Sequence, residues 1–199
     1  MLKLKYSKFI LECGTDESGR GCLAGPVTAG AVILPANYKN SQLNDSKQMG
    51  HKLRLALAKD IRNNAIAYSI AHVFPKKIDD INILNASILA MHMAINKLKI
   101  IPEFIAVDGN RFKAYQMIPH QTIIKGDEKY MNIAAASILA KTARDAYMTE
   151  IHTEFPYYQW DKNKGYPTFG HRSGIKRHGP CKYHRQSFKL LANEIDLDF

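Results

Sequence analysis

Residues 9–34 read FILECGTDESGRGCLAGPVTAGAVIL, and two apolar runs in this stretch flank a glycine-rich turn. The runs at 9–16 and 25–34 have the composition of β-strands, and Pro35 closes the second one. Strands joined directly in this way, followed later by strands that helices separate, predict a mixed sheet.

The turn between the two predicted strands combines acidic residues with glycine. Asp16 and Glu17 are adjacent, and adjacent residues on a strand point to opposite faces of the sheet. Both side chains enter one site only if the chain leaves strand geometry near Glu17, and Gly19 and Gly21 permit such a bend. We therefore expect a turn at which acidic side chains meet backbone N–H groups that approach a ligand closely.

Helices and strands alternate along the rest of the chain. The predicted elements are a helix at 51–64, a strand at 65–73, a helix with an apolar stripe at Leu84, Ile88, Met91, Ile95 and Leu98, strands at 104–110 and 121–127, and a long helix from about 130 to 150. An AAAS run in the long helix allows close backbone approach. After about Pro156 the chain is basic, aromatic and glycine-rich, which indicates a cap of loops and short helices. The expected fold is α/β, with helices on both faces of the sheet.

Acidic residues lie at the ends of three predicted strands, at Asp16–Glu17, Asp108 and Asp127. In open α/β sheets, sites form beyond the carboxyl ends of the strands. Four carboxylates gathered there repel one another and require cations, and oxygen ligands suit Mg²⁺ or Mn²⁺. The alternative is that each acid merely begins a turn, because Asp beside Gly is a common turn signal. A single acid favours that alternative, whereas three strand ends together favour a metal site.

The charge balance indicates the kind of partner. The chain of 199 residues has 28 Lys and Arg against 18 Asp and Glu, so its formal charge is +10. Such an excess suggests a polyanion, most simply nucleic acid, although a basic protein without a specific partner is the alternative. Three widely spaced cysteines do not make a disulfide framework, and neither a signal peptide nor a membrane span is apparent. We expect a cytoplasmic, reduced protein without membrane contact, and a monomer.

Seven segments of the chain form a specific set of motifs. They are TDESGRGCLAGPVTAGAVIL (15–34), LNDSKQM (43–49), IDDINILNASILAM (78–91), AVDGNR (106–111), KGDEKYMNIAAASILAKTARD (125–145), KGYPT (164–168) and HGPCKYHRQSF (178–188). In order and spacing, this set resembles the ribonuclease HII family over nearly the whole chain.

The resemblance implies a ribonuclease H-like fold, with a five-stranded mixed sheet, flanking helices and a small C-terminal helical cap. It divides one compact unit into a catalytic domain at 1–155 and a substrate-binding cap at 156–199. The implied activity is endonucleolytic cleavage of RNA in RNA–DNA hybrids and incision 5′ to single ribonucleotides in duplex DNA, which leaves a 3′-hydroxyl and a 5′-phosphate. The implied roles are ribonucleotide removal from DNA and RNA primer removal.

The resemblance also implies roles for the acidic residues. Asp16, Glu17, Asp108 and Asp127 match the family's four catalytic, metal-binding acids, which position two Mg²⁺ or Mn²⁺ ions. Two such ions activate a water and stabilise the leaving 3′-oxygen in an in-line displacement. Asp16 is expected to bridge them.

Substrate-binding roles follow from the same resemblance. The residues concerned are Gly19, Arg20, Gly21, Lys47, Ser137, Lys141, Tyr166, His184 and Arg185. The Gly19–Gly21 backbone and Tyr166 are expected at the 2′-hydroxyl and the RNA-to-DNA step. Lys47, Ser137 and Lys141 are expected at phosphates, although lone lysines on a helix more often face solvent. His184 and Arg185 of the basic cap are expected near the nucleic-acid backbone.

The chain departs from the family pattern at three positions. Cys22 stands where the family usually has proline, Ser18 replaces a small apolar residue, and Gln48 replaces a second lysine after DSK. None of these changes touches the four acids, so they bear on affinity rather than on activity.

Other functions fit less of the sequence. Ribonuclease HIII shares the fold but carries an extra N-terminal domain and lacks the turn arginine, whereas Arg20 is present here. The KGYPT and GRG elements argue against a junction resolvase. A non-catalytic nucleic-acid-binding module explains the charge but not the acids. Gly25 and Gly30 have P-loop spacing without the Lys-Ser that a P-loop requires.

Two short motifs near the C-terminus have alternative interpretations. His178, Cys181 and His184 have spacing that suggests zinc, but a fourth ligand is not evident. The tail EIDLDF (194–199) loosely resembles peptides that bind bacterial sliding clamps, with Glu194 in place of glutamine, and packing on its own domain is the alternative.

Overall fold

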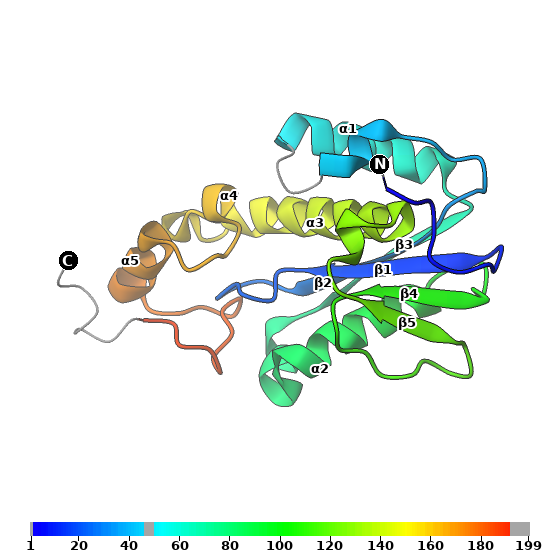
Figure 1. Cartoon of the computed structure of the whole chain (residues 1–199). Helices are drawn as coiled ribbons and strands as arrows, with labels where there is room; N and C mark the ends of the chain where they lie inside the picture. Colours follow the sequence, from blue (N-terminus) through cyan, green and yellow to red (C-terminus); the bar gives the residue numbers. More distant parts are fainter. Residues whose placement is uncertain (1, 46–49, 192–199) are drawn as a thin grey trace.

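The centre of the molecule is a five-stranded sheet with the strand order β3-β2-β1-β4-β5 (Figure 1). The computed structural model describes residues 2–45 and 50–191. The strands are β1 (Glu12–Ser18), β2 (Val27–Ile33), β3 (Ala67–Val73), β4 (Phe104–Asp108) and β5 (His120–Ile123). β2 is antiparallel to β1 and β3, while β4 is parallel to β1 and β5. The predicted mixed sheet is confirmed.

Helices cover both faces of the sheet. They are α1 (His51–Asn64), α2 (Pro75–Asn96) and α3 (Met131–His152). On one face α3 packs on β1 and β2 and α1 packs on α3, while α2 lies on the opposite face against β2 and β3 (Figure 1). In the described part of the chain, no helix combines the length and the apolar character that a membrane crossing requires.

α3 approaches the sheet closely at two glycines. A Cβ atom on Gly14 of β1 would lie 2.3 Å from the carbonyl carbon of Asn132, and one on Gly30 of β2 would lie 2.4 Å from the carbonyl oxygen of Ala136. The AAAS run therefore makes the close backbone approach that its composition predicts. This packing brings Ser137 on α3 within hydrogen-bonding reach of the Asp16 carboxyl group on β1.

A cap lies beyond the C-terminal half of α3 (Figure 1). It contains the 3₁₀ turn η3 (Pro156–Tyr158), α4 (Trp160–Asn163), α5 (Phe169–His178) and the segment that follows. Tyr158 and Trp160 pack in one buried cluster with Met148 of α3 and Leu23 of the turn after β1. The cap and the turn after β1 therefore share a core.

The path of β1 corrects one expectation. Glu17 pairs with Ala29 and Ser18 pairs with Thr28 in the antiparallel ladder between β1 and β2. The chain leaves strand geometry close to the predicted position, but β1 stays regular through Ser18 and the turn begins only at Gly19, so the break comes after Glu17. Asp16 and Glu17 consequently leave the strand in different directions.

Two further element boundaries differ from the sequence prediction. β5 ends at Ile123, and Asp127 lies in the 3₁₀ turn η2 (Gly126–Glu128) rather than at a strand end. α2 begins at Pro75 and is kinked at Asn82, where φ is 63°, and Leu84 of the predicted stripe is 37 % exposed. The remaining 3₁₀ turn, η1, covers Ser41–Asp45.

Candidate active site

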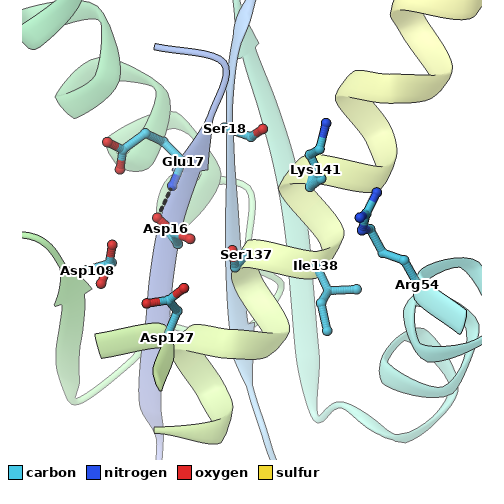
Figure 2. A pocket seen from close by; sticks show the side chains of 9 residues that line it. All are labelled: Asp16, Glu17, Ser18, Arg54, Asp108, Asp127, Ser137, Ile138 and Lys141. Carbon is cyan, nitrogen blue, oxygen red and sulfur yellow. Dashed lines mark hydrogen bonds between the residues drawn. The ribbon is translucent and has the colours of Figure 1, made fainter. Parts of the chain in front are cut away.

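A cavity of about 350 Å³ opens at the carboxyl ends of β1 and β4 (Figure 2). Its lining contains all four predicted acids together with residues of α1 and α3. The lining residues are Asp16, Glu17, Ser18, Arg54, Asp108, Asp127, Ser137, Ile138 and Lys141. The structure thus brings together acidic residues that lie as much as 111 positions apart in the chain (127 − 16).

Three elements hold the acids in place. Asp16 lies on β1 and is only 6 % exposed, and its carboxylate accepts the backbone N–H of Glu17 at 2.7 Å. Asp108 is the last residue of β4 and accepts the backbone N–H of Gly126 at 2.6 Å. That hydrogen bond fixes η2 beside β4, and η2 presents the buried Asp127. The backbone of η2 therefore positions Asp108, and the backbone of β1 itself positions Asp16.

Glu17 differs from the other three acids in its orientation. Figure 2 shows the carboxyl groups of Asp16, Asp108 and Asp127 facing a common space, while the Glu17 side chain extends away from it. The Glu17 carboxylate instead forms an ion pair with the Arg20 guanidinium at 3.2 Å. This orientation follows from the regular path of β1, because neighbouring residues on a strand point to opposite faces.

Burial and mutual repulsion raise the pKa values of the acids. Burial raises the pKa of Asp16 well above its usual range, and Glu17 and Asp108 add repulsion. The pKa of Asp108 is raised by burial and then by Asp127. Burial also raises the pKa of Glu17, although Arg20 opposes that shift. The cavity therefore gathers negative charge that the protein's own cations compensate only in part.

The donor set of the cavity fits a hard divalent cation. Every acidic donor is a carboxylate oxygen, the ligand type that Mg²⁺ and Mn²⁺ prefer, and the raised pKa values indicate a demand for positive charge. Across residues 2–45 and 50–191, however, no three acidic, histidine or cysteine side chains already form a closed cage for an ion. The acidic side chains therefore line the cavity without enclosing an ion position, and Glu17 is held by its ion pair with Arg20.

The glycine turn follows the acids directly and has one buried and two exposed residues. Gly19 is buried and has a φ of 94°, while Arg20 and Gly21 are exposed. Tyr166 lies beside the cavity, since the Lys141 ammonium is 5.9 Å from the centre of its ring. Tyr166 is 41 % exposed, and the pKa of its hydroxyl is raised by burial and by nearby Cys22.

The helical residues expected at phosphates share the cavity. Ser137 and Lys141 both line it from α3, as their four-residue spacing predicts. Lys141 also pairs with Asp145 at 2.6 Å, and Arg54 of α1 contacts the same carboxylate at 3.4 Å. Sequence reasoning missed Arg54, because it comes from a separate helix and belongs to no recognisable motif. Lys47 lies outside the described residues.

The two cap residues expected near the nucleic-acid backbone are buried. His184 is 2 % exposed and Arg185 is fully buried, so neither side chain presents a surface to a phosphate. The Nδ1 atom of His184 accepts the backbone N–H of Cys181 at 3.0 Å, which occupies a nitrogen that zinc would need. Arg185 donates to backbone carbonyl groups, including those of Gly19 and Arg20.

Known proteins resemble this chain over nearly its whole length. A family model described as Ribonuclease HII matches residues 13–191. Ribonuclease HII from Christiangramia forsetii is 63 % identical over 194 residues, which are 98 % of each chain. The structure also resembles the PCNA:RNase HII complex from Archaeoglobus fulgidus, with a TM-score of 0.76, 24 % identity and coverage of 94 % of this chain and 98 % of the other. The structure is also similar to the crystal structure of Bst-RNase HIII in complex with Mn²⁺, with a TM-score of 0.72, 15 % identity and coverage of 90 % of this chain and 67 % of the other.

Proposed function

Because the chain belongs to the ribonuclease HII family, and is thus a metal-dependent endoribonuclease that acts on RNA–DNA hybrids, we propose that it also incises duplex DNA at single embedded ribonucleotides. The proposed cut falls 5′ to the ribonucleotide and leaves a 3′-hydroxyl and a 5′-phosphate. The roles that follow are ribonucleotide removal from DNA and, second, RNA primer removal, both in the cytoplasm.

The observation that carries this proposal is the continuity of the acidic cavity with the glycine turn. β1 supplies two of the acids, the turn follows directly, and the Glu17–Arg20 ion pair joins the two parts at 3.2 Å. A scissile phosphate at the carboxylates therefore places its ribose beside the turn. The 2′-hydroxyl is the group that distinguishes RNA from DNA, so this position suits recognition of a single ribonucleotide.

The acids are the residues that would hold the metal. Asp16, Asp108 and Asp127 would hold two Mg²⁺ or Mn²⁺ ions, joined by Glu17 once it leaves Arg20. Ions bound there would supply activation of the attacking water and stabilisation of the leaving 3′-oxygen. The carboxylates would position the ions and would not themselves attack the phosphate. The solved structure of a ribonuclease HIII with Mn²⁺ supports this choice of ions.

The remaining residues of the site would bind and orient the substrate. Ser137 and Lys141 would contact phosphates from α3, and Lys47 would add a contact from outside the described residues. The exposed backbone of Arg20 and Gly21 would bind the 2′-hydroxyl, with Tyr166 at the RNA-to-DNA step.

The C-terminal part of the chain would extend the substrate-binding surface. We assign residues 1–155 to a catalytic domain and 156–199 to a substrate-binding cap, in a monomer. The tail EIDLDF (194–199) lies outside the described residues and would contact a replication clamp, as the PCNA complex of the archaeal relative suggests. Unchanged clamp binding after deletion of 194–199 would remove this part of the proposal.

The test uses an end-labelled DNA duplex that contains one ribonucleotide. The full chain is incubated with Mg²⁺, Mn²⁺ or EDTA, alongside an all-DNA duplex, a continuous RNA–DNA hybrid and the Tyr166→Phe variant. We expect metal-dependent cutting on the 5′ side of the ribonucleotide. Tyr166→Phe should slow this cut by about fivefold, the worth of one hydrogen bond, and slow hybrid cleavage less.

Two outcomes would contradict the proposal. Cleavage of the hybrid without cleavage at the single ribonucleotide would limit the activity to continuous RNA. Equal slowing of both reactions by Tyr166→Phe would show that Tyr166 does not act at the RNA-to-DNA step.

A further inference from the structure

Two arginine side chains, Arg144 and Arg185, lie completely inside the protein. Their guanidinium groups donate to backbone carbonyl oxygens at the junction of β1, α3 and the cap. Arg144 reaches the carbonyls of Ala24, Pro26 and Lys164 at 2.8–3.0 Å. Arg185 reaches a different set, which includes two residues of the glycine turn.

Arg185 fixes the direction of two consecutive peptide groups. Its Nη2 atom donates to the Gly19 carbonyl at 2.7 Å and its Nη1 atom donates to the Arg20 carbonyl at 2.8 Å. In a trans peptide, the carbonyl oxygen and the next residue's N–H point in opposite directions. Carbonyls held inward therefore direct the N–H groups of Arg20 and Gly21 outward, away from the buried guanidinium.

The outward side of this turn is open. Arg20 and Gly21 are exposed, and a Cβ atom on Gly21 would meet no atom within 4 Å. Two neighbouring N–H donors that point into open space form a site for an oxygen acceptor. The acidic cavity begins at the other end of the same turn, at Glu17.

Arg185 also strengthens these donors. Burial lowers the pKa of Arg185 to about 10, so the guanidinium stays charged at neutral pH. Charge-assisted bonds to the two carbonyls polarise the peptide groups, and polarised peptides donate more strongly through their N–H. Lysine would keep the charge but not the planar fork that reaches both carbonyls at once.

We propose that Arg185 is a positioning residue, which turns and polarises the Gly19–Arg20 and Arg20–Gly21 peptide groups so that their N–H groups bind the 2′-hydroxyl oxygen of the ribonucleotide. The inference rests on the proposed function of the turn and names the residue that sets its geometry. It also gives the cap a role in recognition, because Arg185 is anchored there and its own N–H donates to Leu23 at 2.9 Å.

The test measures preference for a ribonucleotide in binding. In an Asp108→Asn background, which should not cut, the affinity for a duplex with one ribonucleotide is compared with that for the all-DNA duplex. We expect a preference of about fivefold or more, which Arg185→Lys reduces to about one while affinity for the all-DNA duplex stays within about twofold. Arg144→Lys is the matched control, since it alters an equally buried arginine that does not touch the turn carbonyls, and it should keep the preference.

A second pair of variants tests the amide itself. Gly21→Ala keeps the N–H and fits the open space, whereas Gly21→Pro removes the N–H. The preference for the ribonucleotide should survive Gly21→Ala and disappear in Gly21→Pro. This pair tests the inference even if Arg185→Lys is too unstable to measure.

Several outcomes would overturn the inference. If the preference persists in Arg185→Lys, or if this variant loses affinity for both duplexes equally, Arg185 has a merely structural role. Survival of the preference in Gly21→Pro would exclude the amide. If instead the background variant shows no preference while wild type also fails to cut at the ribonucleotide, the proposed function of the turn is at fault rather than the role of Arg185.

Discussion

At the scale of single residues, the carboxyl groups of the cavity oppose the stability of the fold that contains them. Asp16 and Asp108 have raised pKa values because burial and neighbouring acids disfavour their charged forms. A carboxyl group with a raised pKa in the folded state holds its proton more tightly than in the unfolded chain. Its contribution to stability therefore falls as the pH rises above the ordinary value of 3.8.

The first prediction concerns Asp108→Asn. Removal of one like charge should raise the Tm of the metal-free protein by a few degrees at pH 7.5, and by less near pH 3, where the carboxyl group is mostly protonated in both states. Cleavage should fall on the order of 100-fold or more. Thermal unfolding in EDTA at the two pH values measures the first effect, and a lower Tm at pH 7.5 would contradict it.

Residue types and spacing were sufficient to place the four acids in one cavity. They were not sufficient for the orientation of Glu17, because that depends on the β1–β2 ladder and on an ion pair with Arg20. The sequence also indicated nothing of the inward role of Arg185, since a basic residue in a basic segment is expected on the surface. Its burial follows from carbonyl groups that only the folded turn brings together.

At the scale of elements, the contact between α3 and the sheet positions the site. Gly14 and Gly30 leave room for the backbone of α3, and the same helix then carries Ser137 and Lys141 to the cavity. The AAAS composition predicted this contact. The kink of α2 at Asn82 was not predicted, because a periodic apolar pattern does not report a single residue with positive φ.

The second prediction concerns Gly30→Ala. The added methyl group would lie 2.4 Å from the Ala136 carbonyl oxygen, so α3 must shift, which should cost about 1–3 kcal/mol. Gly50→Ser is the control, because a Cβ there meets nothing within 4 Å and serine is a favourable residue before α1. Chemical denaturation measures both variants, and equal stabilities would refute the tight contact.

A buried histidine pair joins the elements of the cap. Trp160 donates its indole N–H to Nε2 of His171 at 2.9 Å, so the His171 proton lies on Nδ1, which faces the Tyr166 carbonyl at 2.9 Å. His184 accepts from Cys181 on Nδ1 and therefore carries its proton on Nε2, which lies 3.1 Å from His171. Both rings are neutral in this network, and a further proton on either ring breaks a hydrogen bond.

The third prediction is acid instability of the cap. Burial, followed by His171, lowers the pKa of His184 from 6.5 to about 4. Because its folded-state pKa is lowered, neutral His184 contributes stability that is complete above pH 6.5 and is lost as the pH falls toward 4. Over this range the unfolding free energy should change by up to about 1.4 kcal/mol per pH unit. Unfolding free energies measured across this range should show that slope. His184→Gln should flatten this slope. The control His178→Gln, at an exposed site on α5, should keep it. Identical slopes in wild type and both variants would exclude the buried histidine pair as the cause.

At the scale of the whole molecule, the formal charge of +10 favours a polyanionic substrate although the cavity itself is acidic. The two features are compatible, because the cations Arg54 and Lys141 line the same cavity as the acids. Composition predicted the partner class. It did not predict this arrangement of charge, which arises because α3 packs on β1 and β2 and α1 packs on α3.

The fourth prediction concerns the salt dependence of binding. Affinity of the Asp108→Asn protein for an RNA–DNA hybrid should fall linearly with salt on a double-logarithmic plot. Lys141→Ala should reduce the slope by about one if this lysine contacts a phosphate. Lys99→Ala, beside the start of β3 at the other end of the sheet, should leave the slope unchanged. An equal slope in the Lys141 variant would remove that contact.

The most direct test of the site is a calorimetric titration of Mn²⁺ into the metal-free protein, with Asp108→Asn and Asp80→Asn as variants. Asp80 is an exposed acid on α2 outside the cavity, so its variant should bind like wild type. Asp108→Asn should bind at least about tenfold more weakly. Wild-type binding near pH 6 should also release protons, because carboxyl groups with raised pKa values lose them to the ion. Equal Mn²⁺ affinity in wild type and Asp108→Asn would contradict the assignment of the acidic cavity as the metal site.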